Sequence, residues 1–324
     1  MKKTYKFLTK SLIAIIIGAI LTSILGTIAF VLGYNDQTSW LRLRGACTII
    51  FAIVGFATMC YAVFMSVKAK DIHIEKIRRS SGFSKTASCL AFLVLFFIFG
   101  HELIKIILAS YQDKFGAFFS IWRILKFVFA LPCSLYFLIM ALPSKYKRKK
   151  IKVPKMLQYI TGVSTVVWAI FGLLATYFYA FLATKNILKI WQILVYLVFT
   201  VFFLFEIKFE HIKPCPRAYI CISSLTFITT MAFTLTTIIS LACGIIPPGM
   251  SFSATELICS LTIGIYALSR VYAITDTMKY VLITSDKGSH SSKFDKHHHH
   301  HHHHSSHNTD NDDNTGNTPV ADEK

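Results

Sequence analysis

Charged residues are scarce in this sequence, and acidic ones especially so. Asp, Glu, Lys and Arg make up 15% of the 324 residues, whereas 54% of the residues are hydrophobic. The mean hydropathy is +0.55. A chain with so few charges cannot cover the surface of one or two water-soluble domains. The composition therefore excludes an ordinary soluble protein and indicates that a lipid bilayer is the main solvent.

The motifs of the common enzyme chemistries are also missing. The sequence has no Gly-rich phosphate loop, no GxSxG motif and no CxxC pair. The segment that starts at His101 begins like a zinc-protease helix, but that motif needs a second His four residues later, where Lys105 stands. We therefore predict a protein without enzymatic activity and without a cofactor.

Eight apolar segments are each long enough to cross a bilayer, which takes about 20 helical residues. They cover residues 11–33, 46–67, 86–109, 117–142, 156–183, 190–205, 218–246 and 254–274. We predict an all-α fold, a polytopic transmembrane helix bundle of about eight spans that occupies residues 1–274. Residues 275–324 are polar and rich in His, and we expect them to form a largely disordered cytoplasmic tail.

Lys and Arg residues are unevenly distributed between the two sides of this bundle. Twenty of them fall at the N-terminus and in the second, fourth and sixth loops, against five in the other loops. This bias predicts that both termini are cytoplasmic and that the protein is a multi-pass protein of the cell membrane. It also accounts for the net charge of +18 without a nucleic-acid partner. We expect the basic loops to contact anionic lipid headgroups.

The third and fourth segments form a hairpin that carries several charges at membrane depth. Each ionisable residue lies roughly 6 to 15 positions from the connecting loop 110–116, so all of them reach similar depths at about 1.5 Å per residue. Because charge inside a bilayer is energetically costly, we expect Glu102 to pair with Arg123 or Lys126, or to be protonated. The ionisable residues of this hairpin are His101, Glu102, Lys105, Arg123 and Lys126.

Two interpretations of these five residues remain open. In the structural one, they form an ion pair near the outer interface, and Lys105 and Lys126 extend to water. In the functional one, they line an outward-facing cavity for an anionic or protonatable solute, with His101 as the pH-sensitive group. Pro132 removes a backbone donor in the fourth segment and predicts a helix kink there.

Further polar features lie in the other segments. Glu206 ends the sixth segment and Arg270 lies near the inner end of the eighth, which predicts a second, structural ion pair. The first and fifth segments carry small residues at every fourth position, which allow helices to approach closely within the chain or in a homodimer. These rows are Ala14, Gly18, Thr22 and Gly26, and Gly172, Thr176, Ala180 and Thr184.

The tail contains a run of eight histidines that could bind a metal ion through neutral imidazole. An affinity tag, a native low-complexity tract and a metal-sensing tail all remain open as explanations. The run consists of His297, His298, His299, His300, His301, His302, His303 and His304.

With a basic loop after the fourth span and Glu206 at the end of the sixth, the chain resembles uncharacterised multi-span membrane proteins of anaerobic Gram-positive bacteria. The resemblance implies a helical membrane bundle and no particular activity.

Two functions of different classes follow from these features. The first is a non-enzymatic accessory or regulatory component that acts through contacts with helices or lipid, including a membrane protein partner. The alternative is a transporter for a small solute or ion, with a charged cavity between the third and fourth spans.

Overall fold

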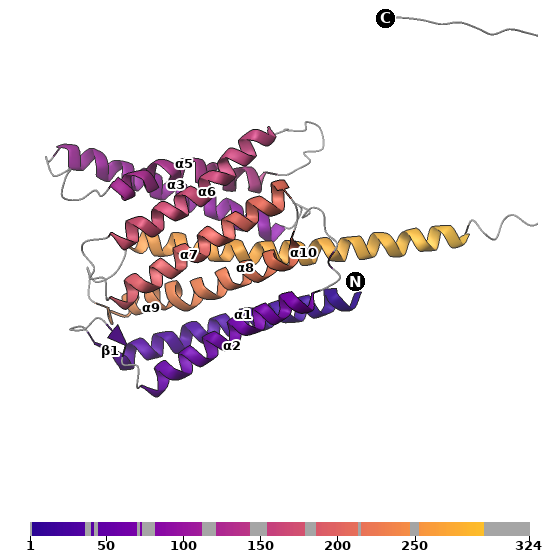
Figure 1. Ribbon diagram of the computed structural model, residues 1–324, viewed down its shortest axis with the longest axis horizontal. Coiled ribbons are helices and arrows are strands. Elements are labelled where there is room, and N and C mark those ends of the chain that lie inside the picture. The colour runs from indigo at the N-terminus through magenta and orange to yellow at the C-terminus, as the bar shows by residue number, and fades with distance from the viewer. Residues whose placement is uncertain are drawn as a thin grey trace, which may run out of the picture. The chain divides into compact units, whose positions relative to one another are not determined.

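The computed structural model describes residues 2–35, 40–41, 45–69, 72, 82–111, 121–142, 154–178, 186–212, 215–246 and 253–294 (Figure 1). The chain divides into two units, Met1–Leu282 and Ile283–Lys324. The contacts described below all lie in the first unit.

Helices account for nearly all of the described secondary structure. Eight of them are long and apolar enough to cross a membrane, which confirms the predicted all-α polytopic bundle. The helices are α1 (Lys2–Gly33), α2 (Ala46–Lys68), α3 (Gly82–Tyr111), α5 (Ile121–Ala141), α6 (Lys155–Tyr177), α7 (Ile187–Ile207) with its π-helical extension η1 (Lys208–Ile212), α8 (Pro216–Thr230) with the π-helical turn η2 (Met231–Leu235) and α9 (Thr236–Ala242), and α10 (Ala254–Phe294). Two short strands, β1 (Tyr34–Asn35) and β2 (Trp40–Leu41), pair antiparallel after α1.

The ends of several helices follow from local chemistry. The side chain of Asn186 accepts a hydrogen bond from the backbone N–H of Leu188 at 2.8 Å and so caps the start of α7. α8 begins with Pro216, which needs no backbone partner at this position. α9 ends at Ala242, and Gly244, two residues later, has a φ of +70° in the left-handed region. The next amide, that of Ile245, bonds back to the carbonyl of Ser240, as in a Schellman motif.

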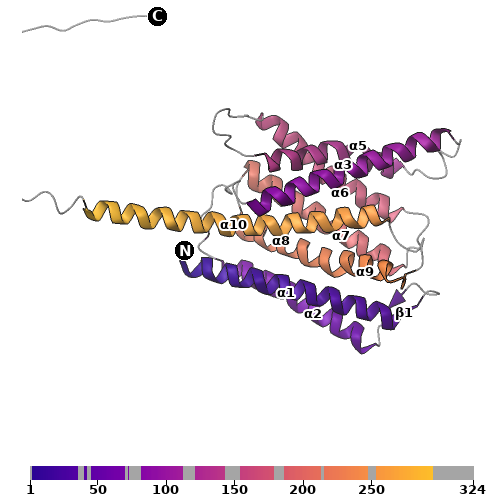
Figure 2. The same cartoon turned by 180° about the vertical axis from the view of Figure 1, so that it is seen from behind.

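Contacts between helices arrange the first unit in three layers (Figures 1 and 2). α1 and α2 pack together on one side, and α3, α5 and α6 on the other. α7 and α8 lie between them, because α7 contacts α6 and α8 contacts α2. α10 belongs to this middle layer, since it is bonded to α5 through Lys126 and to α7 through Gln192.

The small residues of α1 are used for packing inside the chain. A Cβ added at Gly18 would lie 2.7 Å from Thr58 of α2, and one at Gly26 would lie 2.7 Å from Thr236 of α9. On α6, a Cβ at Gly172 would lie 2.4 Å from the ring of Tyr196 of α7. Gly18 and Gly26 of the first row and Gly172 of the second therefore face different partner helices in the same chain, while Ala180 and Thr184 lie outside the described residues.

A pair of hydrogen bonds joins α1 to the π-helical turn η2. The hydroxyl of Ser23 donates to the carbonyl of Met231 at 2.7 Å, and the hydroxyl of Thr236 donates to the carbonyl of Ser23 at 3.2 Å. A side chain that inserts into a helix in this way competes with the regular backbone bonds. This competition explains why the span that contains α8 widens at η2.

α10 is the most buried of the eight spans. In its most apolar window, 78% of the residues are buried inside the protein, against 22% for α3. A helix so enclosed can carry polar groups only where other helices supply partners. The charged residues of α10 therefore mark where the polar sites of the bundle lie.

Candidate ion site

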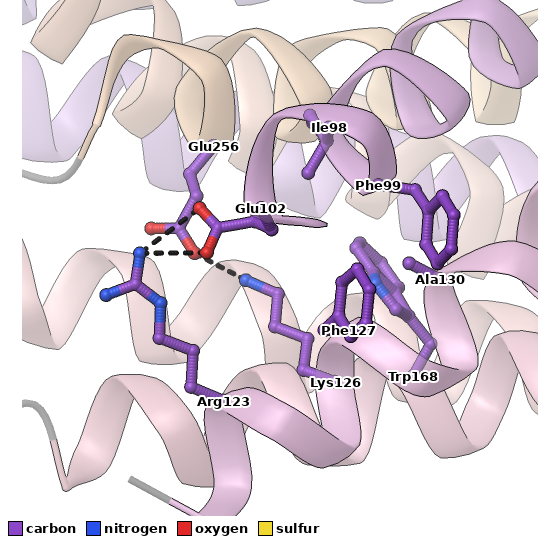
Figure 3. Close-up of a pocket in the computed structure, with 9 residues that line it drawn as sticks. All are labelled: Ile98, Phe99, Glu102, Arg123, Lys126, Phe127, Ala130, Trp168 and Glu256. Atoms are coloured by element: carbon purple, nitrogen blue, oxygen red, sulfur yellow. Dashed lines mark hydrogen bonds and ion pairs between the residues drawn. The ribbon is translucent and has the colours of Figure 1, made fainter. Parts of the chain in front are cut away.

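Charged side chains from α3, α5 and α10 meet in one place (Figure 3), and a hydroxyl from α7 joins them. Glu102 comes from α3, Arg123 and Lys126 from α5, Tyr196 from α7 and Glu256 from α10. We call these five residues the outer cluster. Each carboxylate is bonded to a different base, so the cluster consists of two neighbouring ion pairs.

The first pair joins α3 to α5. Nη2 of Arg123 donates to both carboxylate oxygens of Glu102, each at 3.1 Å. The hairpin argument predicts this partner, because both side chains lie a similar distance from the connecting loop. Lys105 lies 3.8 Å from the same carboxylate and is 43% exposed, while Nδ1 of His101 lies 3.9 Å away. All five residues of the predicted hairpin cluster thus lie in α3 or α5. Glu102 and Lys126 are largely enclosed by the protein, whereas Lys105 is exposed.

The second pair joins α5 to α10. Nζ of Lys126 donates to Oε1 of Glu256 at 2.5 Å and to the hydroxyl of Tyr196 at 2.7 Å. It also lies 4.9 Å from the ring centre of Tyr196 and 5.9 Å from that of Trp168. Lys126 is only 9% exposed, so the expectation that it extends to water is wrong. Its side chain points into the bundle because the carboxylate of Glu256, the hydroxyl of Tyr196 and the ring of Trp168 stabilise its charge there.

Sequence reasoning missed Glu256 as a partner of Lys126. Glu256 lies in the first turn of α10, where a carboxylate is favourable at a helix N-terminus. Because Glu256 stands at the start of an apolar segment, the sequence alone suggests only a charged residue at the membrane interface. The one available signal is that a Lys in the middle of the hairpin needs a counter-charge, and Glu256 is the acidic residue at the matching end of the last span.

A small cavity lies against the outer cluster. Its volume is about 30 Å³, and its polar lining consists of Glu102, Arg123, Lys126 and Glu256. Ile98, Phe99, Phe127 and Trp168 supply most of the apolar wall (Figure 3). A cavity of this size holds one or two water molecules. The arrangement therefore admits water or a small ion and has no room for a larger organic solute.

A second, buried cluster surrounds Arg270, which lies 14 positions after Glu256 in α10. Nε of Arg270 lies 3.0 Å from Oε1 of Glu206, and Nη2 of Arg270 lies 2.5 Å from Oε1 of Glu210. Side-chain exposure is 2% for Arg270, 1% for Glu206 and 3% for Glu210. The predicted partners Glu206 and Arg270 are thus in contact. Glu210, which lies one turn beyond Glu206 on the same face, was not predicted.

Three tyrosines complete this inner cluster. The hydroxyls of Tyr136 and Tyr266 donate to Oε1 of Glu206 at 3.1 and 2.9 Å. The hydroxyl of Tyr219 donates to the other carboxylate oxygen and accepts a bond from Nε of Arg270 at 3.0 Å. A buried carboxylate with this many donors is stabilised by its hydrogen bonds as well as by its counter-charge. We call Tyr136, Glu206, Glu210, Tyr219, Tyr266 and Arg270 the inner cluster.

The two clusters are connected by α10. Glu256 and Arg270 are 14 positions apart in this helix, which corresponds to about 21 Å at 1.5 Å per residue. Both clusters therefore fit within a hydrocarbon layer about 30 Å thick. Between them, Nε2 of Gln192 donates to the hydroxyl of Ser260 at 3.2 Å. The neighbouring span α8–η2–α9 contributes buried hydroxyls of Ser223, Thr234 and Ser240 that have no hydrogen-bond partner among the described residues.

The remaining predicted site residues give no further site. Pro132 lies inside α5, which continues through it. The histidines 297–304 and the basic loop 143–153 lie outside the described residues. Within the part of the chain that the structure describes, no group of three or more His, Cys, Asp or Glu side chains could hold a metal ion. No protein-family model, no curated protein and no solved structure matches this chain, so the resemblance noted from the sequence stays a prediction.

Proposed function

We propose that this integral membrane protein transports a small monovalent cation across the cell membrane. One observation carries the proposal: ionisable side chains within the spans form two clusters, which lie about four turns apart along the buried helix α10. Ionisable groups in a bilayer are energetically costly and therefore rare, and where they occur they commonly line an ion pathway. A purely structural bundle would need neither cluster, because apolar residues pack equally well.

The size and chemistry of the outer cavity support an ion as the substrate. In this conformation the cavity of about 30 Å³ holds one or two water molecules or a small ion. A carboxylate, a hydroxyl and one aromatic ring surround the ammonium of Lys126 and favour a positive charge at that position. Ser260 lies one turn farther along α10 toward the inner cluster and accepts a hydrogen bond from Gln192 of α7. Together they support a cation path along α10 that is closed in this conformation.

Flux into proteoliposomes tests this function. Purified protein is reconstituted, and uptake of H⁺, Li⁺, Na⁺, K⁺, ammonium and methylammonium is measured against protein-free liposomes. We expect at least one cation to enter faster with the protein, and Glu256→Gln to reduce that rate at least tenfold. Lys105→Gln is the matched control, because Lys105 is exposed and should leave the rate unchanged. If none of the cations enters faster than into protein-free liposomes, the proposal is wrong.

The second candidate function is that of an accessory component that binds a membrane protein partner. The observation in its favour is that α3 is the least buried span and exposes large apolar side chains. Leu93, Phe96 and Phe97 are 55%, 51% and 64% exposed. These residues face lipid or another helix. Site-specific crosslinking from Phe97 in intact membranes tests the role: a single protein adduct supports it, and lipid adducts alone contradict it.

A further inference from the structure

We infer that Trp168, Tyr196 and Glu256 form a binding site for a primary ammonium group, which the side chain of Lys126 fills in this structure. We call these three residues the ammonium site. They come from α6, α7 and α10, whereas the ammonium arrives from α5. The site is thus built by helices other than the one that supplies its occupant. Removing the side chain of Lys126 leaves the three binding groups in place.

The contacts of Lys126 match what an ammonium group requires. A primary ammonium group such as that of Lys126 has three N–H donors. Two of them are directed to Oε1 of Glu256 at 2.5 Å and to the hydroxyl of Tyr196 at 2.7 Å. The ring centre of Trp168 lies 5.9 Å from Nζ, within the range of cation–π attraction. Two hydrogen bonds, one of them to a charged carboxylate, and one aromatic ring therefore act on the same nitrogen.

The aromatic side of the site is held rigidly. Tyr196 is 1% exposed and Trp168 is 3% exposed. Their rings meet edge to face with centroids 5.8 Å apart. The other edge of the Tyr196 ring packs directly on Gly172, where no Cβ could fit. A site fixed before its ligand binds loses little conformational entropy on binding.

The same geometry selects among cations. An alkali ion prefers several oxygen ligands, and among the groups in contact with Nζ only Glu256 and Tyr196 supply oxygen. A quaternary ammonium cannot donate a hydrogen bond, so it could not bond to Glu256 and Tyr196 as Nζ of Lys126 does. Ammonium and methylammonium can donate both bonds. The ammonium site itself is inferred from the contacts of Lys126. Only the idea that ammonium or methylammonium is also the cation that crosses the membrane rests on the proposed function.

Thermal unfolding of Lys126→Ala in detergent tests the site. The midpoint Tm is measured with ammonium, methylammonium, K⁺ or tetramethylammonium chloride at equal concentration. We expect methylammonium and ammonium to raise the Tm of Lys126→Ala, on the order of 5 °C near saturation, and the other two salts to leave it unchanged. Wild-type protein and Lys105→Ala should not respond, because Lys126 still fills the site. The double variant Lys126→Ala/Glu256→Gln should lose the response.

Equal responses to all four salts, or no response, overturn the inference. If Lys126→Ala aggregates on extraction, the yield of monodisperse protein extracted with methylammonium instead of K⁺ replaces the Tm. Selective recovery then supports the site, and equal loss in both salts overturns it. The flux assay separates this result from the proposed function. Methylammonium binding without cation flux refutes transport alone, and cation flux without methylammonium binding refutes the ammonium site alone.

Discussion

Lys126 and Glu256 lie 2.5 Å apart although 130 positions separate them in the chain. The contact joins the fourth span to the last one and encloses a charge that would otherwise reach the membrane interface. Because one partner lies in α5 and the other in α10, the pair also ties the layer of α3, α5 and α6 to the centre of the bundle. The stability of the bundle should therefore depend on this pair more than on the other contacts of the outer cluster.

Glu256→Gln should destabilise the protein by about 3 kcal/mol. This is the low end of the range for breaking a buried ion pair, because the side chain of Glu256 is 31% exposed. The physical reason is that Lys126 keeps its charge in a buried position without a counter-charge. Thermal or denaturant unfolding in detergent measures the loss.

Lys105→Gln is the matched control for the loss at Glu256. It removes a charge that faces the carboxylate of Glu102 at 3.8 Å from an exposed position. An exposed pair of this kind is worth about 0.5 kcal/mol. If Glu256→Gln and Lys105→Gln lowered the free energy of unfolding equally, the buried pair of Lys126 and Glu256 would be no more important for stability than an exposed pair.

Tyr266→Phe should destabilise the inner cluster by about 2 kcal/mol. The change removes a hydrogen bond of 2.9 Å to the buried carboxylate of Glu206, and bonds to charged acceptors are the stronger ones. Tyr272→Phe, one turn and a half farther along α10, is the control because Tyr272 is 45% exposed. Unfolding of both variants under the same conditions measures the difference. A Tyr272→Phe variant as unstable as Tyr266→Phe would contradict a specific role for the bond to Glu206.

Gly172→Ala should destabilise the bundle by about 2 kcal/mol, as overpacking of a dense core does. The new methyl group would lie 2.4 Å from the ring of Tyr196 and must displace it. Gly100→Ala provides the contrast, because nothing lies within 4 Å of its Cβ position, and Ala favours a helix by about 1 kcal/mol over Gly. The two unfolding midpoints should move in opposite directions. A stabilising Gly172→Ala would show that α6 and α7 approach less closely than described.

Thiol labelling should reveal the orientation of the bundle. If the N-terminus is cytoplasmic, Cys243 at the end of α9 faces outward and Cys215 before α8 faces inward. In variants that keep only one cysteine, a membrane-impermeant maleimide should label Cys243 in intact cells and Cys215 only after permeabilisation. The reverse pattern would place both termini outside and invert the assignment of outer and inner clusters.

The helical fold could be predicted from the sequence because it depends on local composition. Each predicted span overlaps one of the eight apolar helices. A bilayer forces this outcome, since every backbone group in hydrocarbon must bond within its own helix. Where the sequence-based segment ends at residue 274, α10 continues to Phe294. Polar residues can also form a helix, so the end of an apolar run does not fix the end of a helix.

The candidate sites could be predicted only in part. Depth along two adjacent spans places Glu102 near Arg123, because a short loop fixes their relative height. It gives Lys126 the wrong environment, since depth does not tell which way a side chain points. Glu210 and the tyrosines of the inner cluster carry no sequence signal that separates them from other residues of their spans.

The sequence by itself determined that this chain crosses a bilayer about eight times and that a few ionisable residues lie within the spans. Hydrophobicity and length suffice for this, because they act on one segment at a time. Only the tertiary structure decided which base meets which carboxylate. That choice depends on how each helix is rotated and on which helices touch, and close approaches such as Gly264 of α10 against Thr230 of α8 set both.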